Sequence, residues 1–380
     1  NSRETSNQVD LVLGRKRPEI PRTEDDEVPD QVSKVMTIDG PVPASSLGVT
    51  LTHEHIFSDI GCYVTPPRTD VQKHMHSHQD LTIEMLGEIR RDVTVFTHLL
   101  RVDDADLVIE ELADYKAAGG QTLVEVSTTM KPQRVAMLPD VARSTGVTIV
   151  RGCGYYIQES HPPEVAEHDV DWLTDKLISV ITQGFGNTGI RPGVIGEIGM
   201  SQPVYPDEWK VLAAACKAQK KTGLSLMIHP FFGARSRIAP EVATFVLRQG
   251  VDPGKVCMSH MDGNMDVEYQ ARVAELGVYI AFDTFGVETY YDSLEYNHDC
   301  HDSEREELLI QLIDKGYLRQ LLISQDCGLR IYLRRYGGYG YSHILRHIVP
   351  SLKHRGLDDE TLRRLLVSNA ADFLASPPVV

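Results

Sequence analysis

The sequence predicts an α/β protein in which eight parallel strands close into a barrel inside a ring of helices. Short apolar runs rich in β-branched residues alternate with longer stretches of helical periodicity, as in successive strand–helix units. The runs number eight, which is the number that closes such a barrel, and 380 residues is an ordinary length for one such domain. The predicted strands span residues 48–56, 122–128, 148–156, 193–201, 224–230, 256–262, 278–286 and 320–328.

The N-terminal region is expected to be separate from the barrel. Residues 1–33 are rich in charge, proline and serine and carry too little apolar surface to fold alone, which predicts a flexible, disordered or extended arm. Residues 34–380 are then predicted to form a single barrel domain. Two β-rich runs around a Gly/Pro/Ser cluster predict a hairpin that leads into the first barrel strand. The long segment before the second strand, which includes residues 66–100, is expected to cover the mouth of the barrel.

The stretches between the later strands have the amphipathic period of helices, as in residues 206–223 and 306–316. Both of these stretches end at a glycine, which favours a helix C-terminus because glycine adopts the left-handed conformation without a steric cost. These segments are predicted to form the outer layer of the barrel.

Composition excludes several classes of function. The formal charge of -16 repels phosphate backbones and anionic lipid surfaces, so neither nucleic acid nor a membrane is an expected partner. No window holds about 18 consecutive apolar residues, and we expect a cytoplasmic protein. The six cysteines show no CxxC spacing, so we expect buried thiols rather than a disulfide framework or a zinc knuckle.

Residues of metal-ligand type lie where most of the predicted strands end. Active sites of such barrels lie at the carboxyl ends of the strands, so residues far apart in the sequence would meet in one cavity. His53 and His55 occupy alternate positions of the first strand, where side chains share a face, so both can reach one cation. The candidate metal ligands are His53, His55, Glu197, His229, His260 and Asp326.

Each candidate has an ordinary structural explanation when it is taken alone. Two strand histidines are more often structural than metal-bound, and His229 or His260 alone is more often a satisfied core or surface residue. Asp326 has the N-cap of the following helix as its alternative role. Their joint placement at equivalent ends of strands one, five, six and eight is hard to produce by structural chance, and it favours a metal site.

The motifs GVTLTHEHIF, GVIGEIGMS, MIHPFF, MSHMDG, ISQD and YGGYGYSHIL are spread over residues 48–345. In these motifs the chain resembles the amidohydrolase superfamily and, within it, the phosphotriesterase family, especially its phosphotriesterase-related branch. The resemblance implies a binuclear hydrolase that binds two divalent metal ions through the six candidate ligands. Zinc fits a histidine-rich set best, although manganese, cobalt and iron are also compatible with these ligand types.

The resemblance also implies roles for single residues. Glu197 stands where phosphotriesterases proper have a carboxylated lysine and would bridge the metals, with Glu125 as the alternative bridging residue. Two metals can lower the pKa of a bridging water to near neutrality, which supplies a hydroxide nucleophile. Asp326 would bind one metal and act as the catalytic residue that takes up a proton. Thr284 stands where phosphotriesterases have a relay histidine, which argues against that relay and leaves Asp283 a structural role.

The expected substrate is a small molecule. The related branch implies hydrolysis of a carboxyl derivative, either an amide such as an N-acyl amino acid or a lactone or ester. Phosphotriester hydrolysis is the alternative, and an inactive barrel that acts as a binding protein is the third reading. Tyr155, Tyr156, Arg330 and Tyr339 are the candidate substrate-binding residues, with Arg330 as the clamp for an anionic group. A homodimer is a common assembly in this family.

Overall fold

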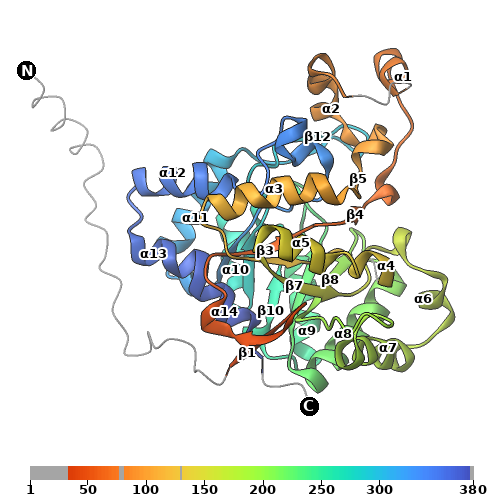
Figure 1. Cartoon of the computed structure of the whole chain (residues 1–380), viewed down its shortest axis with the longest axis vertical. Helices are drawn as coiled ribbons and strands as arrows, with labels where there is room; N and C mark the ends of the chain where they lie inside the picture. The colour runs from red at the N-terminus through yellow and green to blue at the C-terminus, as the bar shows by residue number, and fades with distance from the viewer. Residues whose placement is uncertain (1–32, 77–80, 129–130, 377–380) are drawn as a thin grey trace, which may run out of the picture.

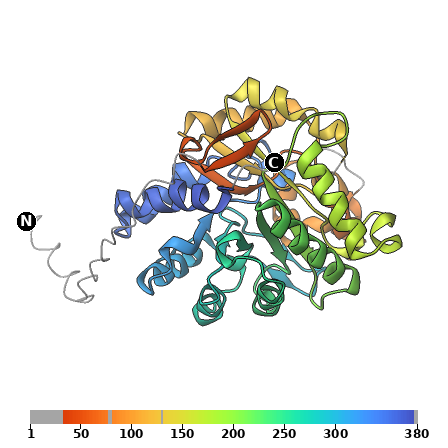
Figure 2. The same ribbon diagram turned by 90° about the horizontal axis from the view of Figure 1, so that it is seen from below.

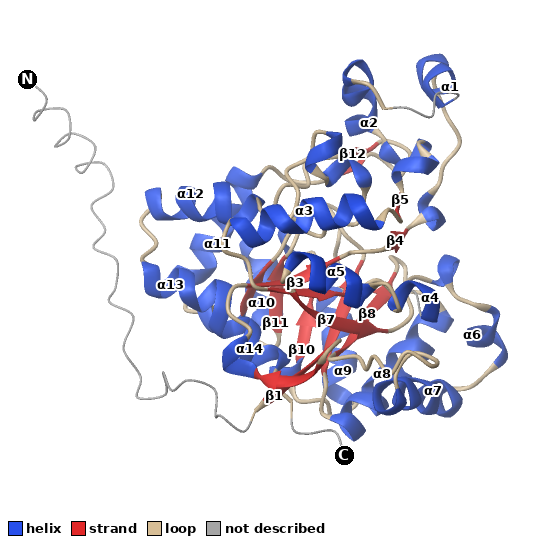
Figure 3. Cartoon of the chain, in the orientation of Figure 1, coloured by secondary structure: helices blue, strands red, loops and turns tan. Residues whose placement is uncertain are grey.

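The computed structural model describes residues 33–76, 81–128 and 131–376. It confirms an α/β fold in which an eight-stranded parallel sheet forms a nearly closed barrel (Figure 3). Each barrel strand lies within one of the eight predicted runs. The barrel strands are β3 (Thr50–Glu54), β6 (Thr122–Glu125), β7 (Thr148–Cys153), β8 (Val194–Met200), β9 (Ser225–Pro230), β10 (Val256–Met258), β11 (Tyr279–Phe282) and β14 (Leu321–Ile323).

The first and last barrel strands are joined mainly through a serine side chain. The amide of His53 on β3 donates a hydrogen bond to Oγ of Ser324, at 3.0 Å, immediately after β14. The amide of Asp326 donates to the carbonyl of His53, at 3.2 Å. The closure of the barrel therefore fixes His53 and Asp326 against each other, although they stand at opposite ends of the domain in sequence.

The helices surround the strands, as the view along the barrel shows (Figure 2). The predicted helix at 206–223 forms α8 (Pro206–Thr222), which ends at Gly223 with a left-handed φ of 73°. The predicted stretch at 306–316 overlaps α11 (Asp302–Asp314) and runs past its end to Gly316. The other helices of the outer layer are α3 (Ala105–Ala117), α4 (Pro132–Val135), α5 (Leu138–Thr145), α6 (Pro163–Glu167), α7 (Val170–Gln183), α9 (Ala239–Arg248), α10 (Val267–Ala274), α12 (Val349–His354), α13 (Asp359–Arg363) and α14 (Asn369–Leu374).

The predicted N-terminal hairpin is present and closes one end of the barrel. It consists of the antiparallel strands β1 (Lys34–Thr37) and β2 (Gly40–Pro43). The amide of Ile38, in the turn, donates to the carbonyl of Ile149 on β7, at 3.0 Å. Val35 is fully buried against the apolar interior of the barrel. The predicted arm at 1–33 falls almost entirely outside the described residues.

The described part of the segment between β3 and α3 lies beyond the other end of the barrel (Figure 1). It contains β4 (Ser58–Asp59), α1 (Asp70–His76), α2 (Leu86–Arg91) and β5 (Arg101–Val102), with β5 antiparallel to β4. Tyr63, Val93 and Leu100 of this segment line the cavity at the carboxyl ends of the barrel strands. A second short hairpin, β12 (Tyr290–Tyr291) and β13 (Asn297–His298), also borders this end. Within the described ranges, no helix is long and apolar enough to cross a membrane.

Candidate active site

The six candidate ligands converge at the carboxyl ends of the strands, as the sequence predicts. Two overlapping groups place their ligand atoms within 4.8 Å of one another: His53 with His55 and Asp326, and His53 with Glu197 and His260. Alternation along β3 turns both histidines of that strand inward. Nε2 of His55 lies 2.9 Å from Oδ1 of Asp326, so the first and last strands meet in one cluster.

Glu197, on β8, lies between histidines from different strands. Its Oε1 is 3.7 Å from Nε2 of His55. Its Oε2 is 3.6 Å from Nε2 of His53 and 3.0 Å from Nδ1 of His229 on β9. The two carboxylate oxygens therefore face different histidines, which is the arrangement that a bridging ligand needs.

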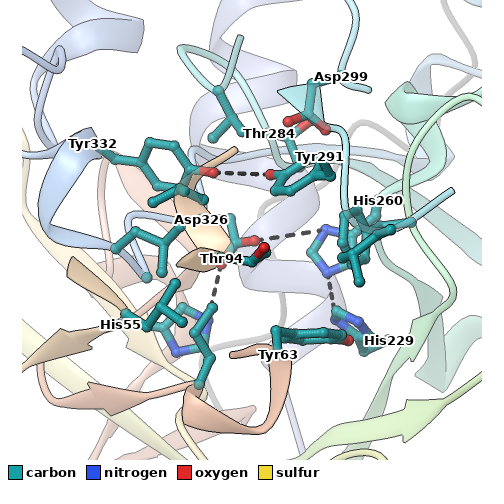
Figure 4. Close-up of a pocket in the computed structure, with 18 of the residues that line it drawn as sticks. His55, Tyr63, Thr94, His229, His260, Thr284, Tyr291, Asp299, Asp326 and Tyr332 are labelled. Carbon is teal, nitrogen blue, oxygen red and sulfur yellow. Dashed lines mark hydrogen bonds and ion pairs between the residues drawn. The ribbon is translucent and has the colours of Figure 1, made fainter. Parts of the chain in front are cut away.

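His229 and His260 complete the cluster on the side opposite His55, as Figure 4 shows. Nε2 of His260 lies 2.6 Å from Nδ1 of His229. On its other ring nitrogen, His229 lies 3.1 Å from the hydroxyl of Tyr156. That contact orients the imidazole and leaves its Nδ1 directed toward Glu197.

Two of the candidate ligands stand in an unusual backbone conformation. His260 has a φ of 53° and Asp326 a φ of 50°, the left-handed region that residues other than glycine rarely adopt. Each such residue costs on the order of 1–3 kcal/mol and persists only where its surroundings hold it. For Asp326 the holding residue is Glu54, which accepts hydrogen bonds from the amides of Gln325 and Cys327, at 2.8 and 2.9 Å. Glu54 is the middle residue of the histidine motif and was not singled out by the sequence analysis.

Asp283 contacts Nδ1 of two of the candidate ligands. Its Oδ2 lies 2.9 Å from Nδ1 of His53, and its Oδ1 lies 3.0 Å from Nδ1 of His260. It also accepts a hydrogen bond from the amide of His260, at 2.7 Å. Such a carboxylate fixes which ring nitrogen of each histidine carries the proton and leaves the other as a metal ligand. For His53 that other nitrogen, Nε2, faces Glu197 and Asp326.

We expect Asp283→Asn to weaken metal binding by about 10-fold to 100-fold, the usual effect of losing a carboxylate behind a histidine ligand. The amide offers one oxygen as a hydrogen-bond acceptor where the carboxylate offers two, so the ring orientation of His53 or His260 would relax. Metal dissociation constants measured by competition with a chromogenic chelator check this, with Asp292→Asn as the control because Asp292 pairs with Arg91 away from the cavity. Unchanged metal affinity in Asp283→Asn would contradict the role.

Thr284 stands at the position where phosphotriesterases have a relay histidine, and its partner is Asp262. The hydroxyl and the amide of Thr284 both donate to Oδ2 of Asp262, at 2.8 and 3.0 Å. Asp262 is in turn paired with the buried Arg305, at 3.2 Å. These contacts give Thr284 a fixed structural partner.

Glu125, the alternative bridging residue, has partners outside the cluster. Its Oε2 accepts a hydrogen bond from the amide of Ile56, and its Oε1 accepts one from the amide of Ser127, at 2.9 Å. Oε1 also lies 3.8 Å from the guanidinium of Arg151. The geometry therefore supports Glu197 over Glu125 as the carboxylate that faces the histidines.

The carboxylates in and beside the cluster favour positive charge on the neighbouring histidines. Burial lowers the pKa of His55, but the hydrogen bond and the charge of Asp326 outweigh it and raise the pKa to about 9. Burial also lowers the pKa of His260, yet Asp283 raises it to about 10. The pKa of Asp326 falls below its usual range because the neighbouring histidines outweigh the effect of burial. Without another cation His55 and His260 would bind protons, whereas burial and the charge of His260 lower the pKa of His229; divalent cations would meet the same demand for positive charge.

The donor set fits a binuclear metal centre. Nε2 of His53 is buried and has no hydrogen-bond partner among the described residues. A buried polar atom of this kind needs a partner, which can be a water, an ion or a ligand. Four imidazoles with two carboxylates are a ligand set that suits zinc and similar transition metals.

A cavity opens above this cluster. The space in it that is not filled by atoms is about 670 Å³, a figure that includes open solvent at its mouth. Of the predicted substrate-binding residues, Tyr156 lines it. The structure places Tyr155, Arg330 and Tyr339 elsewhere.

The other three residues have partners of their own. The hydroxyl of Tyr155 donates to Glu164, at 3.0 Å. Nη2 of Arg330 lies 2.9 Å from Asp103, which turns its guanidinium away from the cavity lining. Tyr339 is 46% exposed and stacks on His343, with ring centroids 4.1 Å apart. The substrate contacts expected of these three residues therefore have no support in the geometry.

The fold and the cluster together define a metal-dependent hydrolase built on a (β/α)₈ barrel. The model of the phosphotriesterase family matches residues 33–374, and the chain belongs to that family. It is 35% identical over 356 residues to an N-acetyltaurine hydrolase of Danio rerio, covering 90% of this chain and 97% of that protein.

Two solved structures are similar to this one. A resiniferatoxin-binding protein from Rhodobacter sphaeroides shares 34% identity at a TM-score of 0.85, over 90% of this chain and 94% of that one. A phosphotriesterase homology protein from Escherichia coli, complexed with phosphate in its active site, shares 26% identity at a TM-score of 0.69, over 86% of this chain and 99% of that one.

Proposed function

We propose that this protein uses two divalent metal ions to hydrolyse a carboxyl derivative, and that its substrate is an amide. The observation that carries the proposal is the position of Glu197, whose two oxygens face histidines of β3 and β9. The chain thus supplies its own bridging carboxylate at the position where phosphotriesterases proper have a carboxylated lysine. The similarity to N-acetyltaurine hydrolases, named for cleaving an amide, supports the same choice of bond.

The proposed metal ligands are the six residues of the cluster: His53, His55, Glu197, His229, His260 and Asp326. The metals, which we propose to be zinc, supply a Lewis acid for the substrate carbonyl and a water of lowered pKa. The protein residues position them. Tyr156 orients His229, Asp283 orients His53 and His260, and the apolar wall of the cavity excludes bulk water.

Asp326 is the proposed catalytic residue because it is the member of the cluster most open to the cavity. Its side chain is 25% exposed, against 5% for Glu197 and 7% for His55. A carboxylate in this position can take a proton from the attacking water and return it to the leaving nitrogen as the C–N bond breaks. Its lowered pKa keeps it ionised.

Phosphotriester hydrolysis is the second candidate, and one observation favours it. Most of the cavity wall is apolar or aromatic, including Tyr63, Phe232 and Tyr332. Such a wall suits an uncharged triester as well as it suits an amide. We place this reaction second because Glu197 replaces the lysine of the enzymes that specialise in it.

Metal removal tests the proposed function. We expect about two metal ions per chain by plasma mass spectrometry, and turnover of N-acyl amines that stops after dialysis against a chelator and returns with added zinc. The panel includes a lactone and a paraoxon-type triester. Turnover of the triester alone would promote the second candidate. Fewer than one metal per chain, with no turnover on readdition, would overturn the hydrolase and favour a binding protein.

A further inference from the structure

The charges that line the cavity are acidic apart from the histidines of the proposed metal centre. Within the described part of the chain, no lysine or arginine lines it. The carboxylates at its surface are Glu197 and Asp326, which belong to the cluster, and Asp299, which does not. Outside the proposed metal centre, an anionic group on a substrate would therefore find no cationic side chain in this wall.

The arginines around the cavity are engaged with acidic partners. Arg330 pairs with Asp103 at 2.9 Å. Arg305, behind the wall, is fully buried and pairs with Asp262 and Asp302 at 3.2 and 2.9 Å. Each arginine would have to break its ion pair with a carboxylate before it could bind an anion in the cavity.

Asp299 is the one acidic residue of the cavity wall that belongs neither to the cluster of candidate metal ligands nor to a direct ion pair with a described residue. It follows β13, and its Oδ2 is buried without a hydrogen-bond partner among the described residues. Burial raises its pKa to about 6, although the charge of Arg305 and hydrogen bonds donated by the Tyr291 hydroxyl and the Thr289 amide to the carboxylate oppose that rise. A buried carboxylate oxygen with no donor is costly, and a donor on a ligand would remove the cost.

Aromatic rings accompany this carboxylate. The hydroxyls of Tyr291 and Tyr332 lie 3.0 Å apart, and both residues line the cavity beside Asp299. Figure 4 shows the two tyrosines and Asp299 on the same side of the cavity, across from His55 and Tyr63. A carboxylate with tyrosine rings beside it is a setting that attracts an ammonium group, through charge-assisted hydrogen bonds and cation–π attraction.

We infer that Asp299, Tyr291 and Tyr332 form a subsite for a protonated amine of the substrate, so that the preferred substrates are amides with a cationic group remote from the scissile bond. This inference rests on the proposed amide hydrolysis. Water adds across the C–N bond, and the products are a carboxylate and a free diamine. The preference is opposite in charge to the sulfonate of N-acetyltaurine, the compound after which the similar hydrolases are named.

A matched substrate series tests the subsite. Mono-N-acetylated diamines with spacers of two to five methylene groups are compared with N-acetyl amino alcohols and N-acetyl aminosulfonates of the same spacer length. For the best spacer we expect kcat/KM of the amine to exceed that of the alcohol by about 10-fold or more, the size of one hydrogen bond to a charged group. The sulfonate should be the poorest of the three, because it faces the carboxylate without a counter-charge.

In Asp299→Asn, kcat/KM for the amine and for the alcohol should lie within about 3-fold of each other, and kcat/KM for the sulfonate should rise. The metal content should stay unchanged. Asp292→Asn is the control, since Asp292 belongs to the same loop region but pairs with Arg91 outside the cavity lining. Hydrolysis of the alcohols without preference for the amines in the wild type would overturn the subsite and leave the proposed function intact. Hydrolysis of none of the three classes would overturn both.

Discussion

Glu197→Ala is expected to remove both metal ions from the purified protein and to abolish hydrolysis. Glu197 lies within 3.0–3.7 Å of three histidines, and its charge is the main one that could offset two cations between them. Burial raises the pKa of Glu197, but His229, His53 and His55 outweigh that effect and lower it, so the ionised form is present to bind metal. Metal content by plasma mass spectrometry and amide turnover are the measurements.

Two companion variants are compared with Glu197→Ala, one at the same position and one as a control elsewhere. Glu197→Gln keeps the shape but loses the anionic oxygen, and we expect it to bind at most one metal. Glu241→Ala, at an exposed position of α9, controls for handling and should retain both ions. Two tightly bound metals in Glu197→Gln would show that the carboxylate is not the bridge, and Glu125 would then have to be reconsidered.

The barrel could be predicted because each strand carries its own signal. A run of buried β-branched residues followed by a helical period identifies a strand–helix unit without knowledge of its neighbours. The ends of the strands were less well predicted. The run at 320–328 contains a strand only over Leu321–Ile323, and the run at 256–262 only over Val256–Met258. Both runs go on into the left-handed residues Asp326 and His260, which leave the ladder and aim their side chains at the cluster.

The cluster could be anticipated from the sequence, whereas the substrate contacts could not. Strand ends meet by topology, so the six candidate ligands had to converge once the strands were placed. Arg330 depends instead on a contact with Asp103, 227 residues away, which no local pattern reveals. Tyr291 belongs to the short hairpin after β11 and Asp299 directly follows that hairpin, which has no apolar period to mark it. Loops take their positions from individual side-chain partners, and a single sequence does not show those partners.

Asp326→Asn is expected to lower kcat by about 10²-fold to 10⁴-fold, the range for losing a positioned acid or base. The amide keeps an oxygen that can bind metal, so with zinc in excess the metal content should stay close to that of the wild type. The backbone should also keep its position, because Glu54 holds the neighbouring amides and the amide of residue 326 donates to His53.

The comparison of kcat with metal content decides whether Asp326 acts as a base or only as a ligand. A variant with two metals and a greatly reduced kcat indicates proton transfer by the carboxylate. If Asp326→Asn instead loses metal and its activity recovers fully at high zinc, the residue is a ligand alone. In that case the proton would have to pass through another group in the cavity, and Asp299 is the remaining carboxylate in its wall outside the cluster.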